Sequence, residues 1–461
     1  MKNWLLIICP IVAALVGGSL FLWGFPSKIA WTAGITLLVA SWWITEPISI
    51  PATSLIPLAL FPMVGVLTPE QVAGAYGNKL VLLMLGGFML SAGMERSGAH
   101  KRIALGMVNL FGGGSARSLV FGFMAASAFL SMWISNAATT LMLLPIAMAV
   151  VAQAENKRLH VSLLLGIAYA ASVGGVGTPI GTPPNVVFMG IYYDHVGEEV
   201  GFMQWMSWTL PVVLIMFPIV GFWLTRGMGK IEVIQLPQVG QWRTEEVRTL
   251  IVFAFTALLW ITRSQPFGGW TALVDQAGFP MPFANDASIA LLGAIALFLI
   301  PNGKGEQLLD WQSARQIPWG VLILFAGGLS MASAFKSSGL SELLGTSLAS
   351  LGQLPTLLLI ATICLCVTFL TEVTSNTATT TLLLPILATA AVAASIEPRL
   401  FMIPATISAS FAFMLPVATP PNAIVFGSQR LTVKQMAHEG FVLNLIGVIV
   451  VTLVCYFRFT R

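Results

Sequence analysis

Long apolar stretches separated by short polar connections make up most of this 461-residue chain. Many reach the roughly 17 to 25 residues that a helix needs to cross a bilayer. We therefore predict an all-α polytopic membrane protein with eleven spanning helices. The predicted spans are 4–25, 29–46, 50–68, 79–95, 161–190, 205–225, 249–263, 287–301, 318–336, 400–428 and 440–457. The first stretch is longer than the apolar region of a signal peptide, so we expect a spanning helix there.

Two further apolar stretches, 118–152 and 355–394, contain a polar phrase near the middle. The phrase begins at Ser135 in the first stretch and at Ser375 in the second, and nine of its twelve positions are identical. Uncharged hydroxyl and amide groups at such a depth need partners because no bulk water is available. Duplicated polar breaks inside apolar helices indicate a ligand site that both halves of the chain form together.

The composition agrees with a membrane protein and excludes other classes. Hydrophobic residues make up 57% of the chain and charged residues only 9%, against roughly 25% charged residues in soluble domains. The net charge of +4 comes without a basic stripe that would indicate nucleic-acid binding. The four cysteines and four histidines are scattered, without metal-ligand spacing or an acid–base set. We therefore do not expect an enzyme.

The positions of the basic residues orient the spans, because cytoplasmic connections are enriched in lysine and arginine. With a cytoplasmic N-terminus and a C-terminus outside, fifteen of the 22 basic residues lie inside. The stretch 118–152 is flanked on both sides by basic residues, Arg117 and Lys157, which favours a re-entrant hairpin over a single span. We predict a second hairpin, entering from the outside, at 355–394.

The duplication extends beyond the polar phrases. A Thr-Pro-Pro-Asn motif starts at Thr182 and again at Thr419, which is 237 residues later (419 − 182), while the phrases are 240 residues apart (375 − 135). In the predicted topology the matching spans run in opposite directions. Inverted repeats with broken helices are the layout of secondary transporters. The alternative is a duplicated helical packing without transport.

Each polar break is expected to end one half-helix and to begin another. Ser135 and Ser375 are suited to cap the half-helices that follow them, and Thr182 and Thr419 are suited to the same role in the broken helices. Helix N-termini attract anions, and carboxylates match their free N–H groups. The four N-termini therefore predict an anion site.

The half-helices that lead into the breaks end with free carbonyl groups beside the hydroxyls of Ser131 and Thr371. Uncharged oxygen ligands suit a small cation such as sodium, so the two kinds of site together predict symport. Glu372 adjoins the second cation site, as either a proton-coupling group or a satisfied structural carboxylate. Four threonines of the outgoing halves are expected to bond back to their own helix instead: Thr139, Thr140, Thr379 and Thr380.

With these motifs, the chain resembles the divalent anion/sodium symporter family, whose bacterial members carry di- and tricarboxylates. The resemblance implies a homodimer in the inner membrane, with a scaffold domain and a transport domain that moves as an elevator. It implies a first sodium site of Ser131, Ser135, Asn136 and Gly181, and a second of Thr371, Ser375, Asn376 and Ala418. The substrate residues that it implies are Asn136, Ala137, Thr182, Pro183, Asn376, Thr377, Thr419 and Pro420.

The same resemblance divides the chain into segments. The scaffold helices of the first repeat are expected in 1–117 and further scaffold helices and loops in 205–354. The transport domain is expected in 118–204, with a hairpin at 118–152 and a broken helix at 161–190, and in 355–439, with a hairpin at 355–394 and a broken helix at 400–428. A C-terminal helix is expected in 440–461.

One position departs from the family pattern, because Ala137 stands where a threonine is usual, as in Thr377. One hydroxyl contact to the substrate is therefore absent. We predict a sodium-coupled importer of di- or tricarboxylates such as succinate, malate or fumarate. The alternatives are a symporter of sulfate or another inorganic anion, a sodium-independent carboxylate exchanger, and an uncoupled anion channel. An exchanger would place a cationic side chain near the motifs, and none is present there.

Overall fold

The computed structural model describes residues 4–111, 115–153, 156–228, 240–264, 268–348 and 354–460. The regular structure of these ranges is helical, with one isolated β-bridge between Pro301 and Gln307. Eight of the described helices are long and apolar enough to cross a membrane. The prediction of an all-helical polytopic membrane protein is thereby confirmed, while the exact number and orientation of the spans stay predictions.

The helices of the first half follow the predicted order. They are α1 (Leu5–Leu22), α2 (Ser27–Thr45), α3 (Ile50–Thr53), α4 (Leu55–Met63), α5 (Pro69–Tyr76), α6 (Lys79–Ser97), α7 (Ala99–Phe111), α8 (Ala116–Ser131), α9 (Asn136–Gln153), α10 (Lys157–Gly175), α11 (Pro183–Val196) and α12 (Phe202–Leu224).

The second half continues in the same way. Its helices are α13 (Thr244–Ile261), α14 (Gly269–Gln276), α15 (Asp286–Leu299), α16 (Trp311–Ala314), α17 (Trp319–Ser338), α18 (Leu340–Leu348), α19 (Thr356–Thr371), α20 (Asn376–Ala393), α21 (Arg399–Ala409), α22 (Pro420–Phe426) and α23 (Val433–Phe459).

Both polar phrases break a helix at the predicted position. In the first copy α8 ends at Ser131 and α9 begins at Asn136, and in the second α19 ends at Thr371 and α20 begins at Asn376. The Thr-Pro-Pro-Asn motifs likewise begin α11 and α22 after irregular segments. The breaks are thus confirmed. Whether each helix pair enters and leaves the membrane on one face stays a prediction.

Several elements differ from the prediction. The expected span 50–68 is divided at Ser54 into α3 and α4. Pro57, in the first turn of α4, has no N–H to bond to the carbonyl oxygen of Thr53, so a continuous helix would lack this bond.

The short helices α5, α14 and α16 were not predicted. Neither were α7 and α18, which begin after Gly98 and Gly339. These glycines end α6 and α17 in the left-handed conformation, with φ of 76° and 84°. A Ser-Gly pair that stops each preceding helix was therefore the overlooked signal.

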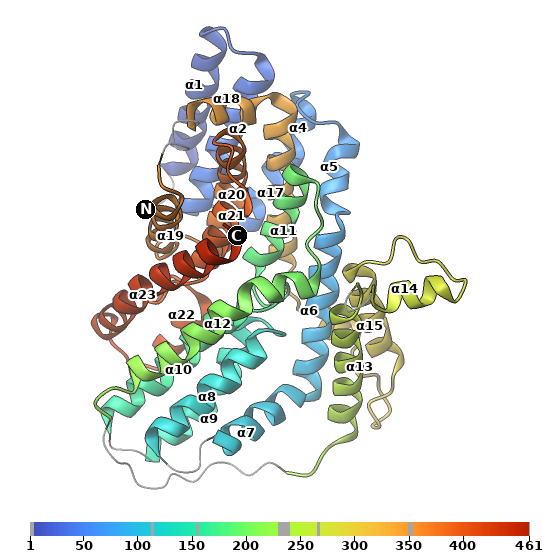
Figure 1. The fold of residues 1–461 in the computed structure, drawn as a ribbon, viewed down its shortest axis with the longest axis vertical. Helices are drawn as coiled ribbons and strands as arrows, with labels where there is room; N and C mark the ends of the chain where they lie inside the picture. Colours follow the sequence, from blue (N-terminus) through green and yellow to red (C-terminus); the bar gives the residue numbers. More distant parts are fainter. Residues whose placement is uncertain are drawn as a thin grey trace.

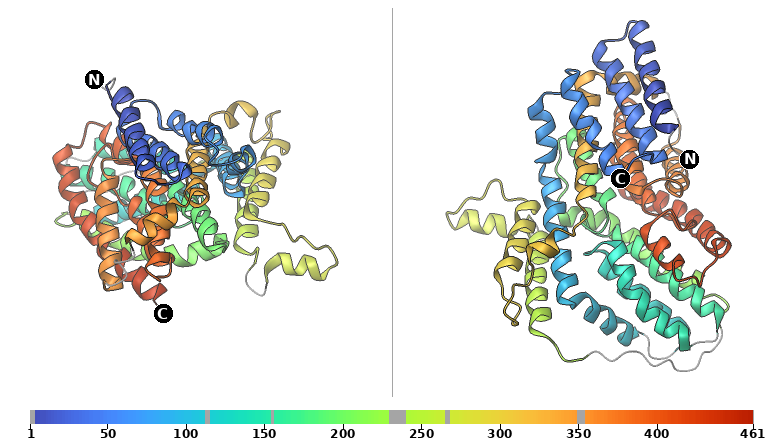
Figure 2. Two further views of the ribbon diagram at one scale, coloured as in Figure 1. Left: turned by 90° about the horizontal axis from the view of Figure 1, so that it is seen from above. Right: turned by 180° about the vertical axis from the view of Figure 1, so that it is seen from behind.

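The helix α10 is enclosed by its neighbours α8, α9, α12 and α22. Every residue from Val161 to Gly175 is buried. It packs closely against α8, where a Cβ on Gly174 would overlap the backbone of Ala128, so only glycine permits this approach. Figure 1 shows α8, α9, α10 and α12 grouped together, with α22 and α23 beside them. Both views of Figure 2 show the segment around α14 extending away from this body.

Candidate functional site

The first polar break brings a hydroxyl and an amide together. Ser131 Oγ, at the end of α8, donates a hydrogen bond to Asn136 Oδ1, at the start of α9. Ser131 is fully buried. Ser135 Oγ accepts from the backbone N–H of Ala138 at 3.2 Å, so this serine caps α9 as predicted.

The second break repeats this pair at the equivalent positions. Thr371 Oγ1 lies 2.6 Å from Asn376 Oδ1 and 3.0 Å from the carbonyl oxygen of Ala409, so its single O–H has two acceptors within reach. Ser375 precedes α20 but its side chain accepts no bond from the helix, so the predicted cap is not formed here. The duplication seen in the sequence therefore extends to side-chain geometry.

The asparagines of the Thr-Pro-Pro-Asn motifs hold the two broken helices in the same way. Asn185 Nδ2 donates to the carbonyl oxygens of Gly175 at 2.9 Å and Thr178 at 2.7 Å. In the second copy Asn422 Nδ2 donates to Ala412 and to Leu415, both at 3.0 Å. Each partner in the second copy is 237 residues after its counterpart (422 − 185, 412 − 175, 415 − 178).

These two asparagines have no role in the sequence-based interpretation, although the duplication of their motif was the signal. Asn185 and Asn422 are both fully buried. Among the described residues, neither Oδ1 has a hydrogen-bond partner. Their amide nitrogens fix the irregular segments that join α10 to α11 and α21 to α22, so each break has a defined backbone conformation.

Oxygen atoms converge at the first predicted sodium site. A Cβ on Gly175 would lie 2.5 Å from Asn136 Oδ1, and one on Gly181 would lie 2.9 Å from the carbonyl oxygen of Ser131 and still closer to that of Gly175. The structure therefore brings Ser131, Asn136 and Gly181 together, as predicted, with Ser135 at the adjoining cap. Only glycine leaves room at positions 175 and 181 for these oxygens to approach.

At the second predicted site, Thr371 and Asn376 meet directly, and Ala418 lies in the neighbouring irregular segment. The backbone N–H of Ala418 donates to the carbonyl oxygen of Leu415 at 3.2 Å. That same oxygen accepts from Asn422. Ser375 makes no capping bond, and its side chain is partly exposed. In the described part of the chain, no hydrogen bond joins Ala418 itself to the Thr371–Asn376 pair.

Glu372 connects the second break to two other elements. Its Oε1 accepts from the backbone N–H of Met414 at 2.9 Å and from Asn444 Nδ2 at 2.7 Å, and its Oε2 accepts from the N–H of Leu415 at 2.9 Å. The residue is 3% exposed. A buried carboxylate with three hydrogen-bond donors is consistent with the second of the two roles predicted for Glu372, that of a satisfied structural carboxylate. The first repeat has no acid at the equivalent position, which is Met132 (372 − 240).

The predicted substrate residues lie around the N-termini of four half-helices. Thr419 accepts from the N–H of Asn422 at 3.3 Å and caps α22, whereas Thr182 makes no side-chain cap at α11. The prolines of both motifs, Pro183 and Pro420, occupy the first helical positions as expected. Among these residues Thr182, Thr377 and Thr419 are buried, and Ala137 is partly exposed.

The two repeats are interleaved at this point. The half-helix α9, from the first break, packs against α22 of the second repeat, and α20, from the second break, packs against α11 of the first. The two repeats therefore contact each other directly and do not form separate halves. This contact is consistent with the expectation that one anion interacts with helix N-termini of both repeats.

Two of the four threonines expected to bond back to their own helix do so. Thr140 donates to the carbonyl oxygen of Asn136 at 2.8 Å, and Thr380 donates to that of Asn376 at 2.7 Å. The prediction is wrong for the other two. Thr379 instead shares a hydrogen bond of 2.6 Å with Thr374, and Thr139 Oγ1 has no partner among the described residues.

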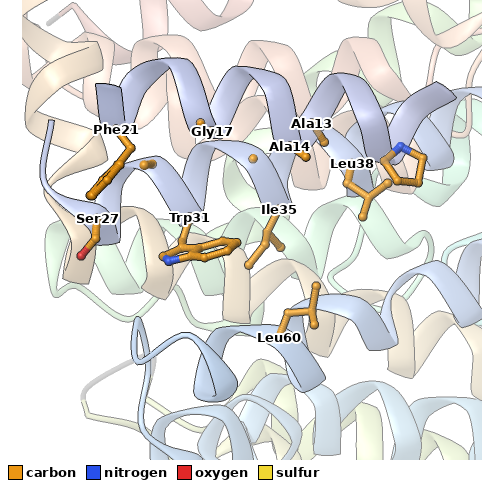
Figure 3. Close-up of a pocket in the computed structure, with 13 residues that line it drawn as sticks. Ala13, Ala14, Gly17, Phe21, Ser27, Trp31, Ile35, Leu38 and Leu60 are labelled. Atoms are coloured by element: carbon orange, nitrogen blue, oxygen red, sulfur yellow. The ribbon is translucent and has the colours of Figure 1, made fainter. Parts of the chain in front are cut away.

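Two cavities differ in their relation to the candidate site: a large one lies elsewhere, and a small one adjoins Thr182. A cavity of about 490 Å³ lies between α1 and α2 near Leu60, and Figure 3 shows its almost entirely apolar lining. Its lining contains no charged side chain, so it does not resemble the predicted anion site. Thr182 and Pro183 instead line a cavity of about 10 Å³ against α6, which is room for about one water molecule.

Duplicated polar breaks, two broken helices and interleaved repeats inside an apolar helical body define the class of secondary membrane transporters. A family model supports this conclusion over nearly the whole chain. Residues 2–459 match the sodium:sulfate symporter transmembrane region, so the chain belongs to that family, and the resemblance inferred from the motifs is confirmed. Members of this family are transporters rather than enzymes.

Curated relatives agree with this assignment. The sodium-dependent dicarboxylate transporter SdcS of Staphylococcus saprophyticus is 41% identical over 455 residues, covering 93% of this chain and 86% of the relative. The protein of the same name from Staphylococcus aureus is also 41% identical, covering 94% and 86%. Both relatives match across the breaks and the broken helices.

Two solved structures share the fold at low sequence identity. The YdaH transporter of Alcanivorax borkumensis superposes with a TM-score of 0.63 at 14% identity, covering 87% of this chain and 88% of its own. MtrF of Neisseria gonorrhoeae gives a TM-score of 0.58 at 14% identity, covering 86% and 84%. These similarities concern the fold alone.

Proposed function

We propose that this protein is a sodium-coupled symporter that imports di- or tricarboxylates, with succinate, malate and fumarate as the first substrates to test. The observation that carries the proposal is the duplicated hydroxyl–amide pair at the two breaks, Ser131 with Asn136 and Thr371 with Asn376. Each pair stands beside half-helix N-termini of both repeats. The names of the curated relatives support the same ion and substrate class.

The two pairs provide the oxygen atoms for two sodium ions. Hydroxyl, amide and backbone carbonyl oxygens are hard, uncharged ligands of the kind that sodium requires. In the first site these come from Ser131, Asn136 and the segment around Gly181, with Ser135 adjoining. In the second site they come from Thr371, Asn376 and the segment around Ala418, with Ser375 adjoining.

The substrate carboxylates are bound by the helix N-termini between these ions. Neither the hydroxyl–amide pairs nor the Thr-Pro-Pro-Asn motifs contain a lysine or arginine. Two sodium ions therefore offset the charge of a dicarboxylate. The hydroxyl of Thr182 is not used as a helix cap, which leaves it free to donate to a carboxylate. Ala137 in the first repeat stands at the position equivalent to Thr377 in the second, so the two sides of the substrate site are chemically unequal.

Transport proceeds by an elevator movement within a homodimer of the inner membrane, with the N-terminus in the cytoplasm. The segments 118–204 and 355–439, which include the two re-entrant hairpins, form the moving transport domain. The segments 1–117 and 205–354 form the scaffold, and 440–461 is the C-terminal helix. The elevator movement would change the contact between α6, in the proposed scaffold, and α11, in the proposed transport domain.

The decisive experiment is uptake of labelled succinate into proteoliposomes with and without an inward sodium gradient. Sodium coupling predicts accumulation above the external concentration only with the gradient. Equal uptake in both conditions rejects symport and favours a carboxylate exchanger, and linear uptake without accumulation favours a channel. If excess sulfate abolishes succinate uptake while succinate does not affect sulfate uptake, the preferred substrate is an inorganic anion.

A further inference from the structure

A second site with different chemistry lies away from the polar breaks, where the ends of three helices meet. A cavity of about 530 Å³ is lined by Arg158 at the start of α10, by Arg226 after α12 and by the first two turns of α23. The residues of α23 include Lys434 and His438. We call this cavity the basic pocket. None of its residues belongs to the proposed sodium or substrate sites.

The two arginines are held in place by one buried carboxylate. Glu439, which is 4% exposed, accepts from Arg158 Nη1 through Oε1 and pairs with Arg226 Nη1 through Oε2, each at 2.7 Å. The guanidinium of Arg226 also lies over the ring of Trp223, with its Cζ 3.5 Å from the centroid. Both side chains are about one third exposed. Their remaining N–H donors are thus positioned in advance, which suits planar recognition of a phosphate.

The pocket carries an excess of positive charge. Three cations, Arg158, Arg226 and Lys434, are opposed by the single carboxylate of Glu439, which leaves a net charge of +2. Lys434 is exposed and forms no ion pair within the described residues. His438 Nδ1 lies 3.9 Å from the same carboxylate and adds a further charge when protonated. An anion with more than one negative oxygen matches this arrangement.

The surroundings of the pocket indicate where that anion comes from. The helices α12 and α23 are antiparallel neighbours, because they meet at the pocket and again at Trp208 and Phe459, whose ring centroids are 5.7 Å apart. Beside the pocket both helices present exposed apolar side chains, with Phe222 59% and Phe441 45% exposed. The basic residues lie on the side that the charge pattern assigns to the cytoplasm, where anionic lipid headgroups are found.

We propose that the basic pocket binds the phosphate group of an anionic phospholipid, with the acyl chains lying along the exposed apolar faces of α12 and α23. The lipid connects α10, α12 and α23 at one point. Binding is independent of sodium and carboxylate, so the proposal does not rest on the transport function.

Native mass spectrometry of the purified protein measures lipid binding directly, with phosphatidylglycerol and phosphatidylcholine of the same acyl chains as probes. We expect tighter binding of phosphatidylglycerol. The test variant combines Lys434→Gln with His438→Gln, which leaves the Arg158–Glu439–Arg226 group intact and the protein folded. Removing one cation near the headgroup is expected to weaken binding about fivefold. Lys101→Gln, at an exposed lysine of α7, is the matched control and is expected to bind like the parent protein.

Three results would overturn the proposal. Equal affinity for the two lipids shows that the headgroup charge is not recognised. A variant that binds phosphatidylglycerol like the Lys101→Gln control shows that the lipid lies elsewhere. Protection of the protein against thermal unfolding by millimolar inorganic phosphate, without any lipid preference, assigns the pocket to a free anion. A melting temperature and a gel-filtration profile equal to those of the parent confirm that the variant is folded.

Discussion

Glu372→Gln tests whether the buried carboxylate holds the second break in place or carries a proton. The substitution keeps the shape of the side chain but replaces one acceptor oxygen with an NH₂ group. The carboxylate accepts three hydrogen bonds, two through Oε1 and one through Oε2. A glutamine that keeps its oxygen toward Met414 and Asn444 turns its NH₂ group against the N–H of Leu415.

The magnitude follows from these contacts. A hydrogen bond to a charged group contributes about 1.5–3 kcal/mol, and an unsatisfied buried donor costs about 1–3 kcal/mol. We expect a destabilisation of about 2–4 kcal/mol, concentrated in the segment that carries Leu415 and Ala418. Because this segment forms part of the proposed second sodium site, the sodium concentration for half-maximal uptake should rise about tenfold or more. The matched control is Glu397→Gln, whose partner Arg399 is at the surface.

The assay combines thermal unfolding in detergent with succinate uptake into proteoliposomes over a range of sodium concentrations and pH values. A positioning role predicts a lower melting temperature and a higher sodium concentration for half-maximal uptake, while the pH profile of uptake keeps its shape. A proton-coupling role predicts an unchanged melting temperature and a flat pH profile. The reasoning is refuted if Glu372→Gln behaves like Glu397→Gln in both unfolding and sodium dependence.

Three further predictions address the site and its surroundings. Asn376→Ala removes the oxygen that Thr371 contacts at 2.6 Å, so succinate uptake should fall at least a hundredfold while gel filtration still shows a folded protein; an active variant contradicts the site. Ala137→Thr adds the hydroxyl that the first repeat lacks, and competition assays should show a changed ratio of succinate to sulfate affinity; an unaltered ratio removes Ala137 from the selectivity argument. Burial raises the pKa of Asp194 from 3.8 to about 6, partly opposed by Lys336, so the folded protein loses stability as pH rises from about 4 to 6. The free energy of unfolding of Asp194→Asn should therefore exceed that of the parent protein by about 1–2 kcal/mol at pH 7.5 and equal it at pH 4. The magnitude is smaller than the full pKa shift implies because the carboxyl is partly exposed to solvent. Equal melting temperatures at pH 7.5 contradict this prediction.

Much of the architecture was predictable because it is local. The apolar stretches reveal spanning helices through their length, and proline or a polar phrase inside them marks a break. The helices α7 and α18 escaped prediction, although Gly98 and Gly339 end the helices before them. Their short amphipathic sequences carry too little hydrophobicity to be recognised as membrane elements, and only the backbone conformation at the glycines separates them from α6 and α17.

The sequence by itself determined that this is a polytopic membrane protein with a duplicated polar break, and it singled out Ser131, Asn136, Thr371 and Asn376 as candidate ligands. Repetition and hydrophobicity can be read from a chain without knowing which segments meet. Only the tertiary structure decided that each outgoing half-helix packs against the broken helix of the other repeat. It also decided that Asn185, Asn422 and Glu372 hold the backbone of the breaks. These partners are up to 72 residues apart, and which donors reach a buried acceptor depends on how the helices pack rather than on any local pattern.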